Sequence, residues 1–327
     1  MKNLIRKPRS PFQIIVVAAI LLTNVFASAQ LKPPVIINQP GYYPVLLGDI
    51  EIVALSDGTL PLNLNDILQD GKPGEINNLL KENYQTTALQ CSVNAYLIKT
   101  GGKLILIDAG TSDIYGPALG HLTENLLKAG YQPEQINAVL LTHIHMDHIG
   151  GIASGDKLTF PNANIYISRI EAEYYLNLEN KAKAPAAAKR FFDGAVLKLA
   201  PVVKAGKLKK FEFGAELFPG ITPVESFGHT PGHAFYKVES QNQKMLFWGD
   251  IIASDIVQFA DPFITSAFDY DAKQAAVTRS KALMNAVKGG YWVAVAHSSF
   301  PGIGHISKKG TGFRLVPINF STTGVGQ

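Results

Sequence analysis

Cysteine is nearly absent from this sequence of 327 residues. The single one, Cys91, can form no internal disulfide, so stability must come from a large core, a bound metal or a partner subunit. Cys91 follows Leu89 and Gln90 and opens a strand-like run. This position favours a buried, small hydrophobic side chain over a nucleophile.

Long apolar runs are also scarce. The run at residues 14 to 22 is too short for a membrane span and lies between a basic segment and Ala27-Ser28-Ala29, a small-x-small cleavage site. We therefore expect residues 1–29 to be a secretory signal that is cleaved near Ala29/Gln30. Residues 30–327 would then be periplasmic or secreted, with no stable membrane anchor. An uncleaved N-terminal anchor is the alternative, but it would leave the cleavage site without a purpose.

The sequence has no excess of one charge outside this segment. Of 30 basic residues, four lie in the first 29 positions, which hold no acidic residue, so the remainder carries 26 charges of each sign. Enzymes that act on nucleic acids need a basic surface. The neutral mature chain argues against a nucleic-acid partner.

Strand and helix patterns alternate in two similar halves. Apolar stretches bounded by turn residues predict strands at 50–55, 92–99, 103–107, 135–141, 163–167, 221–227, 234–239, 244–248 and 291–296. Helical spacing of apolar residues predicts helices at 119–129, 170–178, 186–199 and 271–287. No change of composition marks a linker, so residues 30–327 read as one domain with a Pro-rich, extended N-terminal arm. The economical α/β architecture is two sheets packed face to face, with helices outside.

Side chains that can bind metal follow the predicted strands. The segment THIHMDHIGG, residues 142–151, places His143, His145, Asp147 and His148 after one strand. Three more potential ligands each follow a strand of their own: His229, Asp250 and His297. Strand ends are rigid positions from which loops converge on one rim, so we expect these residues to meet.

Their spacing suggests two metal ions. His143, His145 and His229 supply three nitrogens and leave one coordination position open, as in a catalytic zinc site. Asp147, His148 and His297 would form a second site. Asp250 has two carboxylate oxygens and could bridge ions about 3.5 to 4 Å apart.

The series His-x-His-x-Asp-His, Gly228-His229, Gly249-Asp250 and Ala296-His297 resembles the metal-binding motifs of the metallo-β-lactamase superfamily, in its order. PGYYPVLLGDIEIVALSDGT, YQPEQINAVLLTHIHMDHIGG, GHTPGHAFYKVESQNQK and SFPGIGHI further resemble methyl parathion hydrolases and their lactonase relatives. This likeness covers nearly the whole mature chain. It implies a four-layer αβ/βα sandwich, two divalent metals, a homodimer, and hydrolysis of lactones or aryl esters. Organophosphate triester hydrolysis is the alternative activity.

Departures from the family pattern concern the substrate. The aromatic residues at the pocket mouth correspond to Tyr115, Tyr175 and Phe192, with tyrosine where methyl parathion hydrolases have other aromatic residues. Acyl-homoserine lactonases carry a tyrosine three residues after the bridging aspartate, where this chain has Ala253 followed by Ser254. Zinc β-lactamases use a cysteine ligand, and Cys91 lies far from the motifs in sequence. The pocket is therefore expected to differ while the metal chemistry stays the same.

The chemistry expected of such a centre is attack by a metal-bound hydroxide, with Asp147 or Asp250 moving the proton afterwards. Nitrogen and oxygen ligands of this kind accept Zn²⁺ and also Mn²⁺, Co²⁺ or Fe²⁺. A periplasmic protein that binds metal without catalysis would use the same ligands. It would have no reason to leave coordination positions open to water.

Other polar and aromatic residues have two interpretations each. Asp108, at a strand end, is expected to orient a ligand histidine, although an aspartate here could simply form a turn. His233 is expected to support the site rather than bind metal. His121 is interpreted as solvated, and His305 could line the pocket rim. Three further aromatic residues are more simply core residues than pocket residues: Phe191, Phe259 and Phe268.

Overall fold

The computed structural model describes residues 39–112 and 114–321, and residues 40–321 all belong to one compact unit. The predicted secretory signal lies outside the described residues. No helix in the described part is long and apolar enough to cross a membrane.

The first sheet has seven strands in the order β1-β2-β4-β5-β6-β9-β10. Their bounds are β1 (Tyr42–Leu47), β2 (Ile50–Asn63), β4 (Ala88–Thr100), β5 (Lys103–Ile107), β6 (Ala138–Leu140), β9 (Asn164–Ser168) and β10 (Leu208–Phe211). The sheet is mixed: β1, β2, β4 and β5 pair antiparallel, and β5, β6, β9 and β10 pair parallel. All three residues of β6 are buried apolar residues, as expected of a central parallel strand.

The second sheet has six strands in the order β11-β12-β13-β15-β16-β17. Their bounds are β11 (Ile221–Glu225), β12 (Ala234–Ser240), β13 (Gln243–Phe247), β15 (Trp292–Ala294), β16 (Ile303–Lys309) and β17 (Gly312–Pro317). It is also mixed, because β13 and β15 pair parallel and the other neighbours pair antiparallel. Two small sheets pair β3 (Leu68–Gln69) with β14 (Thr265–Ser266), and β7 (Ala153–Ser154) with β8 (Lys157–Leu158).

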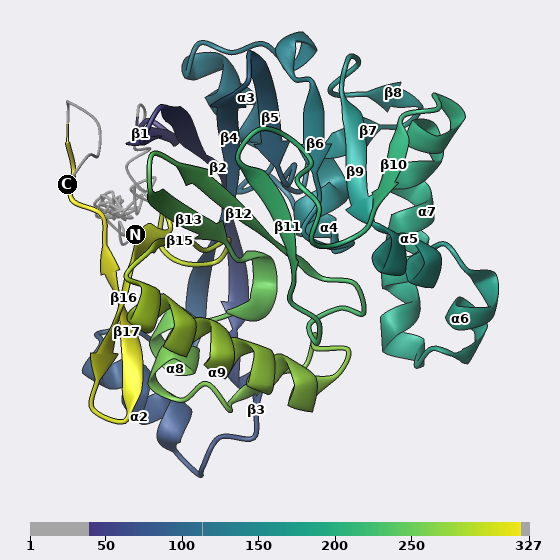
Figure 1. Ribbon diagram of the computed structural model, residues 1–327. Helices are drawn as coiled ribbons and strands as arrows, with labels where there is room; N and C mark the ends of the chain where they lie inside the picture. The colour runs from purple at the N-terminus through teal and green to yellow at the C-terminus, as the bar shows by residue number, and fades with distance from the viewer. Residues whose placement is uncertain (1–38, 113, 322–327) are drawn as a thin grey trace, which may run out of the picture. The chain divides into compact units, whose positions relative to one another are not determined.

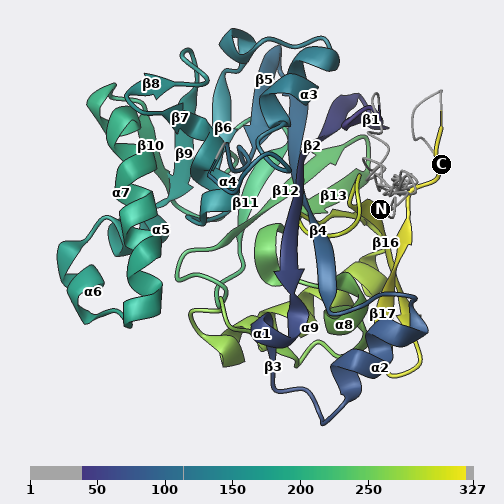
Figure 2. The ribbon, with the colours of Figure 1, turned by 180° about the vertical axis from the view of Figure 1, so that it is seen from behind.

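The α-helices are α1 (Leu64–Ile67), α2 (Glu75–Glu82), α3 (Leu122–Lys128), α4 (Met146–Ile149), α5 (Arg169–Tyr175), α6 (Leu178–Lys183), α7 (Lys189–Lys204), α8 (Asp255–Ala260) and α9 (Ala272–Gly289). The longest, α7 and α9, lie outside the two sheets, whereas the short α4 lies between the two halves (Figures 1 and 2). Helix α7 shows why the chain folds this way locally. Its buried residues Phe192, Ala195, Leu199 and Val202 recur every three to four positions and face the first sheet.

Three clusters of buried side chains define the layers. One joins the facing surfaces of the two sheets, with Ile98 and Ile105 from the first sheet and Tyr236 and Phe247 from the second. A second cluster packs α3, α5 and α7 on the outer face of the first sheet, and a third packs α8 and α9 on the second sheet. The prediction of a four-layer αβ/βα sandwich with two mixed sheets is confirmed.

The structure differs from the predicted elements at several places. Part of the Pro-rich arm is strand β1, and helices α2 and α8 were not predicted. Strand β2 continues past Asp57-Gly58 through a bulge, where the register against β4 shifts. The buried Asp57 accepts hydrogen bonds from the backbone N–H groups of Thr111, Gly120 and Leu122. The bulge therefore fixes the loop that carries Tyr115.

Candidate metal centre

Four loops at the ends of strands bring all seven predicted ligands together. His143 and His145 follow β6, and Asp147 and His148 lie in α4 directly after them. The remaining three follow strands of the second sheet: His229 after β11, Asp250 after β13 and His297 after β15. They form two groups, and the potential ligand atoms of each group lie within 4.8 Å of one another.

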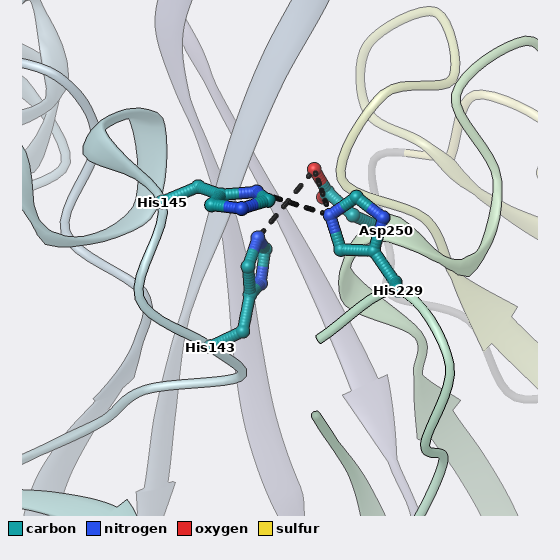
Figure 3. Close-up of side chains that lie close together, drawn as sticks. All are labelled: His143, His145, His229 and Asp250. Atoms are coloured by element: carbon teal, nitrogen blue, oxygen red, sulfur yellow. Dashed lines mark hydrogen bonds and ion pairs between the residues drawn. The ribbon is translucent and has the colours of Figure 1, made fainter. Parts of the chain in front are cut away.

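The first group contains His143, His145, His229 and Asp250, whose side chains converge from three loops, with both His143 and His145 on the loop after β6 (Figure 3). His145 Nδ1 lies 3.1 Å from His229 Nε2. The Asp250 carboxylate closes the group, because its Oδ2 lies 3.7 Å from both His143 Nε2 and His229 Nε2. This arrangement is three nitrogens and one oxygen around a common centre.

The second group contains Asp147, His148, His297 and again Asp250. His297 Nε2 lies 3.0 Å from Asp250 Oδ2 and 3.3 Å from Asp147 Oδ2. His148 Nε2 lies 2.9 Å from Asp250 Oδ1 and 3.6 Å from Asp147 Oδ2. Asp250 therefore lies between the two groups, with a carboxylate oxygen within 3.7 Å of two histidines of each group.

Buried polar atoms without a hydrogen bond test whether these residues fit metal ions. His143 Nε2, His148 Nε2 and Asp250 Oδ1 are fully buried and make no hydrogen bond, although the last two lie 2.9 Å apart. Such atoms are costly in a protein interior unless a partner satisfies them. Since imidazole nitrogen and carboxylate oxygen are ligands of divalent transition metals, the two groups fit two such cations.

Other parts of the chain fix the orientation of the ligand rings through their second nitrogen. His148 Nδ1 donates to Asp108 Oδ2 at 2.8 Å, and His297 Nδ1 donates to the Ser92 carbonyl at 2.8 Å. Asp108 also accepts from the backbone N–H and the hydroxyl of Thr142, each at 2.8 Å. When the proton of a neutral histidine is fixed on Nδ1, Nε2 carries the free lone pair. This tautomer can bind a cation through Nε2.

His233 supports Asp250 and belongs to neither ligand group. Its Nε2 accepts the backbone N–H of Asp250 at 3.1 Å, so its proton lies on Nδ1, which contacts Ser226 Oγ at 2.6 Å. The Ser226 hydroxyl in turn donates to the His233 carbonyl at 3.1 Å. Burial lowers the pKa of His233 well below its usual value, which keeps this ring neutral.

The centre combines neutral histidines with histidines and carboxylates that favour their charged forms. Burial lowers the pKa of His145 to about 3, and that of His143 well below the usual value, so both rings stay neutral. Burial opposes charge on His148 and His297, but the Asp250 carboxylate raises the pKa of both above the usual value. Burial likewise opposes ionisation of Asp250, whose pKa the surrounding histidines lower. Protons on two histidines can exchange for cations, because metal binding releases protons.

Sequence reasoning missed two acidic residues that support the ligands. Asp269 is buried and accepts from His229 Nδ1 at 2.9 Å, while its other oxygen lies 3.4 Å from the guanidinium of the buried Arg279. No local pattern marks Asp269. Glu171 accepts from the backbone N–H groups of Ile144 at 2.9 Å and Gly232 at 2.8 Å. The Ser-x-x-Glu signature at the start of α5 indicates a helix N-terminus but not this role.

A cavity of about 360 Å³ opens onto the two ligand groups. Its other walls are mostly apolar, with leucines of β2 and α1, Met146, Phe191 and Phe268. Tyr115, predicted for the substrate pocket, lines this cavity. Phe191 and Phe268 line it as well, although both were expected to be core residues.

Two other predicted pocket residues lie elsewhere. Tyr175 and Phe192 are buried in the core cluster on the outer face of the first sheet and line a neighbouring cavity. Among the residues with two interpretations, His305 stacks on Trp292 at 3.8 Å between ring centroids and does not line the cavity. His121 contacts Glu124 at the start of α3. Cys91 is buried, with its thiol 3.8 Å from the His297 carbonyl, and contributes to the cavity wall.

Comparisons with known proteins agree with this geometry. Residues 88–297 match the model of the metallo-beta-lactamase superfamily. An N-acyl homoserine lactonase of Bacillus thuringiensis is 24% identical over 219 residues, which are 61% of this chain and 79% of the relative.

Two solved structures share both fold and sequence. The hydrolase AbOPH is 36% identical with a TM-score of 0.83, over 87% of this chain and all of that one. AidC, a dizinc quorum-quenching lactonase solved with a product, is 29% identical with a TM-score of 0.80, over 86% of this chain and 99% of that one. As the motif series predicted, this chain belongs to the metallo-beta-lactamase superfamily.

Proposed function

We propose that this protein is an exported hydrolase that uses two divalent metal ions, with zinc as the first choice of metal, to cleave lactones or aryl esters. The observation that carries the proposal is the pair of ligand groups joined by Asp250, with unsatisfied buried nitrogens, beside a largely apolar cavity. AidC, described as a dizinc lactonase, is similar over 86% of the chain.

The two groups would each hold one ion. One ion would be bound by His143, His145 and His229, and the other would be bound by Asp147, His148 and His297. Asp250 belongs to both groups and would contact both ions. Divalent ions held by these residues would lower the pKa of a water molecule and polarise the carbonyl of the substrate.

The carboxylates nearest the reacting atoms are Asp147 and Asp250, whose side chains are 15% and 9% exposed. Either can receive a proton at a carboxylate oxygen. The apolar walls exclude bulk water and receive the uncharged part of the substrate.

The proposal also includes export and a homodimer. The basic segment, the apolar run and Ala27-Ser28-Ala29 support cleavage near Gln30. The likeness to methyl parathion hydrolases and their lactonase relatives supports the dimer. Expression of the full-length chain in a bacterial host, followed by mass spectrometry and light scattering of the periplasmic fraction, measures both.

The test of function combines metal analysis of residues 30–327 with a substrate panel. The panel contains dihydrocoumarin, short and long acyl-homoserine lactones, an aryl ester, methyl parathion, nitrocefin and lactoylglutathione. We expect two metal ions per chain and highest turnover on a lactone or the aryl ester. We expect His143→Ala and Asp250→Asn each to lower kcat/KM by roughly a thousandfold or more.

Other outcomes would point to other functions. Highest turnover on methyl parathion would favour an organophosphate triesterase, and highest turnover on nitrocefin or the thioester would contradict the proposal. Metal binding without turnover of any ester would indicate a metal-binding protein. If His143→Ala and Asp250→Asn fold and their kcat/KM stays within a few-fold of the wild-type value, the two-metal mechanism is contradicted.

A further inference from the structure

Two cavities share a wall beside the metal centre. The cavity of about 360 Å³ at the ligand groups and a second one of about 530 Å³ are both lined by Arg190, Phe191 and Phe268. The rest of the second cavity is rich in aromatic side chains: Tyr174, Tyr175, Phe192 and Tyr270. A substrate whose reacting carbonyl lies at the two ligand groups, and which carries a long arm, would bring that arm close to these three shared residues.

Arg190 places a cation on the shared wall. Its guanidinium carbon lies 4.9 Å from the centroid of the Phe191 ring and 5.8 Å from that of Phe268. Contact with two aromatic faces holds the guanidinium at the wall and leaves its N–H groups available. Arginine in this setting suits a planar, bidentate partner such as a carboxylate.

Within the described part of the chain, no carboxylate pairs with Arg190, because no carboxylate oxygen lies within 4.0 Å of its guanidinium nitrogens. Four carboxylates line the two cavities. Asp147 and Asp250 face the ligand histidines, and Asp269 is engaged by His229 and Arg279. The fourth, Asp66, is exposed on α1 and forms no ion pair either.

We propose that Arg190 makes the enzyme selective for esters or lactones that carry a carboxylate on an arm remote from the reacting carbonyl. The inference rests on the proposed function. The apolar walls bind the arm, and the guanidinium binds the carboxylate at its end. Because Arg190 is exposed to solvent, water screens the ion pair and the selectivity is moderate.

The test uses pairs of substrates that differ in one carboxylate. On the acyl side the pair is 4-nitrophenyl hexanoate and mono-4-nitrophenyl adipate. On the alcohol side it is phenyl acetate and 4-carboxyphenyl acetate. The metal-loaded enzyme is compared with Arg190→Gln, Arg190→Lys and Lys189→Gln. The last variant is a matched control, because Lys189 is the preceding cation of α7 and lines neither cavity.

In at least one pair, we expect Arg190→Gln to lower the ratio of kcat/KM for the anionic over the neutral ester about tenfold, through KM. The kcat/KM for the neutral ester should fall far less than that for the anionic ester, Arg190→Lys should retain part of the preference, and Lys189→Gln should retain all of it. Added salt should reduce the preference of the wild type. An unchanged ratio in both pairs would overturn the inference.

A binding measurement separates this inference from the proposed function. Hexanoate and adipate differ by one carboxylate, and calorimetric titration of the metal-loaded protein needs no turnover. If no ester is hydrolysed, the proposed function fails. Recognition of a remote carboxylate by Arg190 is then still supported if adipate binds about tenfold more tightly than hexanoate and Arg190→Gln removes the difference. It is overturned if the two ligands bind alike.

Discussion

At the scale of single residues, the centre depends on side chains that never need to touch a metal. Three ligand histidines donate their second ring N–H to a fixed acceptor: His148 to Asp108, His229 to Asp269 and His297 to the Ser92 carbonyl. Each acceptor sets the tautomer and the direction of the remaining lone pair. The supporting residues would therefore contribute to the free energy with which the two groups bind cations.

Asp269→Asn tests this dependence. An asparagine keeps the size of the side chain but weakens the bond to His229 Nδ1 and removes the charge beside Arg279. We expect metal affinity, measured by competition with a chelator, to fall about 10- to 100-fold. Asp156→Asn is the control, since Asp156 is exposed, forms an ion pair with the exposed Lys204 at 3.4 Å and belongs to neither ligand group. Equal affinity in the two variants would show that Asp269 does not position the ligand.

At the scale of elements, the start of helix α5 joins the two halves of the centre. Ser168 Oγ accepts the backbone N–H of Glu171 at 3.1 Å and donates to the Gly232 carbonyl at 2.7 Å. Glu171 then accepts from Ile144, between two ligand histidines, and from Gly232, near His229. A Cβ on Gly232 would lie 2.3 Å from the Glu171 nitrogen, so the two segments are in direct contact.

Glu171→Gln tests this junction. The glutamine amide offers one oxygen where the carboxylate offers two, so one buried backbone N–H loses its acceptor. We expect the free energy of unfolding of the metal-free protein, measured in urea, to fall by about 1–3 kcal/mol. The matched control is Glu173→Gln, which changes an exposed carboxylate of the same helix. A loss no larger than in this control would mean that the carboxylate does not hold the loops.

At the scale of the whole molecule, the ligands come from both sheets. His143, His145, Asp147 and His148 follow β6 of the first sheet, and the other three ligands follow strands of the second sheet. A bound cation therefore links two layers that otherwise meet through the buried cluster between them. Binding to the native state but not to the unfolded chain stabilises the fold by mass action.

Removal of metal should show this link. At free metal about a hundred times Kd, binding adds roughly 2.7 kcal/mol per site, so we expect chelation to lower Tm by at least about 5 °C. Differential scanning calorimetry before chelation, after it and after readdition of zinc measures the shift. In His143→Ala the shift should be much smaller. An unchanged Tm in protein shown to be metal-free would contradict a link between the sheets.

The substrate pocket shows where sequence reasoning was limited. Successive residues of a helix point about 100° apart, so Phe191 faces the cavity while Phe192 faces the core. The same packing buries Tyr175 of α5. Phe268 and Arg190 reach the cavity from segments distant in sequence, and no periodicity identifies such a meeting.

The sequence by itself determined the ligand series and the layered fold, because strand ends are rigid and alternating elements can bury their apolar faces in few ways. Asp250 was expected to be shared because its carboxylate has two oxygens, and the structure places it in both groups. Only the tertiary structure decided which side chains support the ligands and which line the cavity, since those contacts join distant segments. Asp269, Glu171 and Arg190 gain their roles through packing, which sets the direction of each side chain.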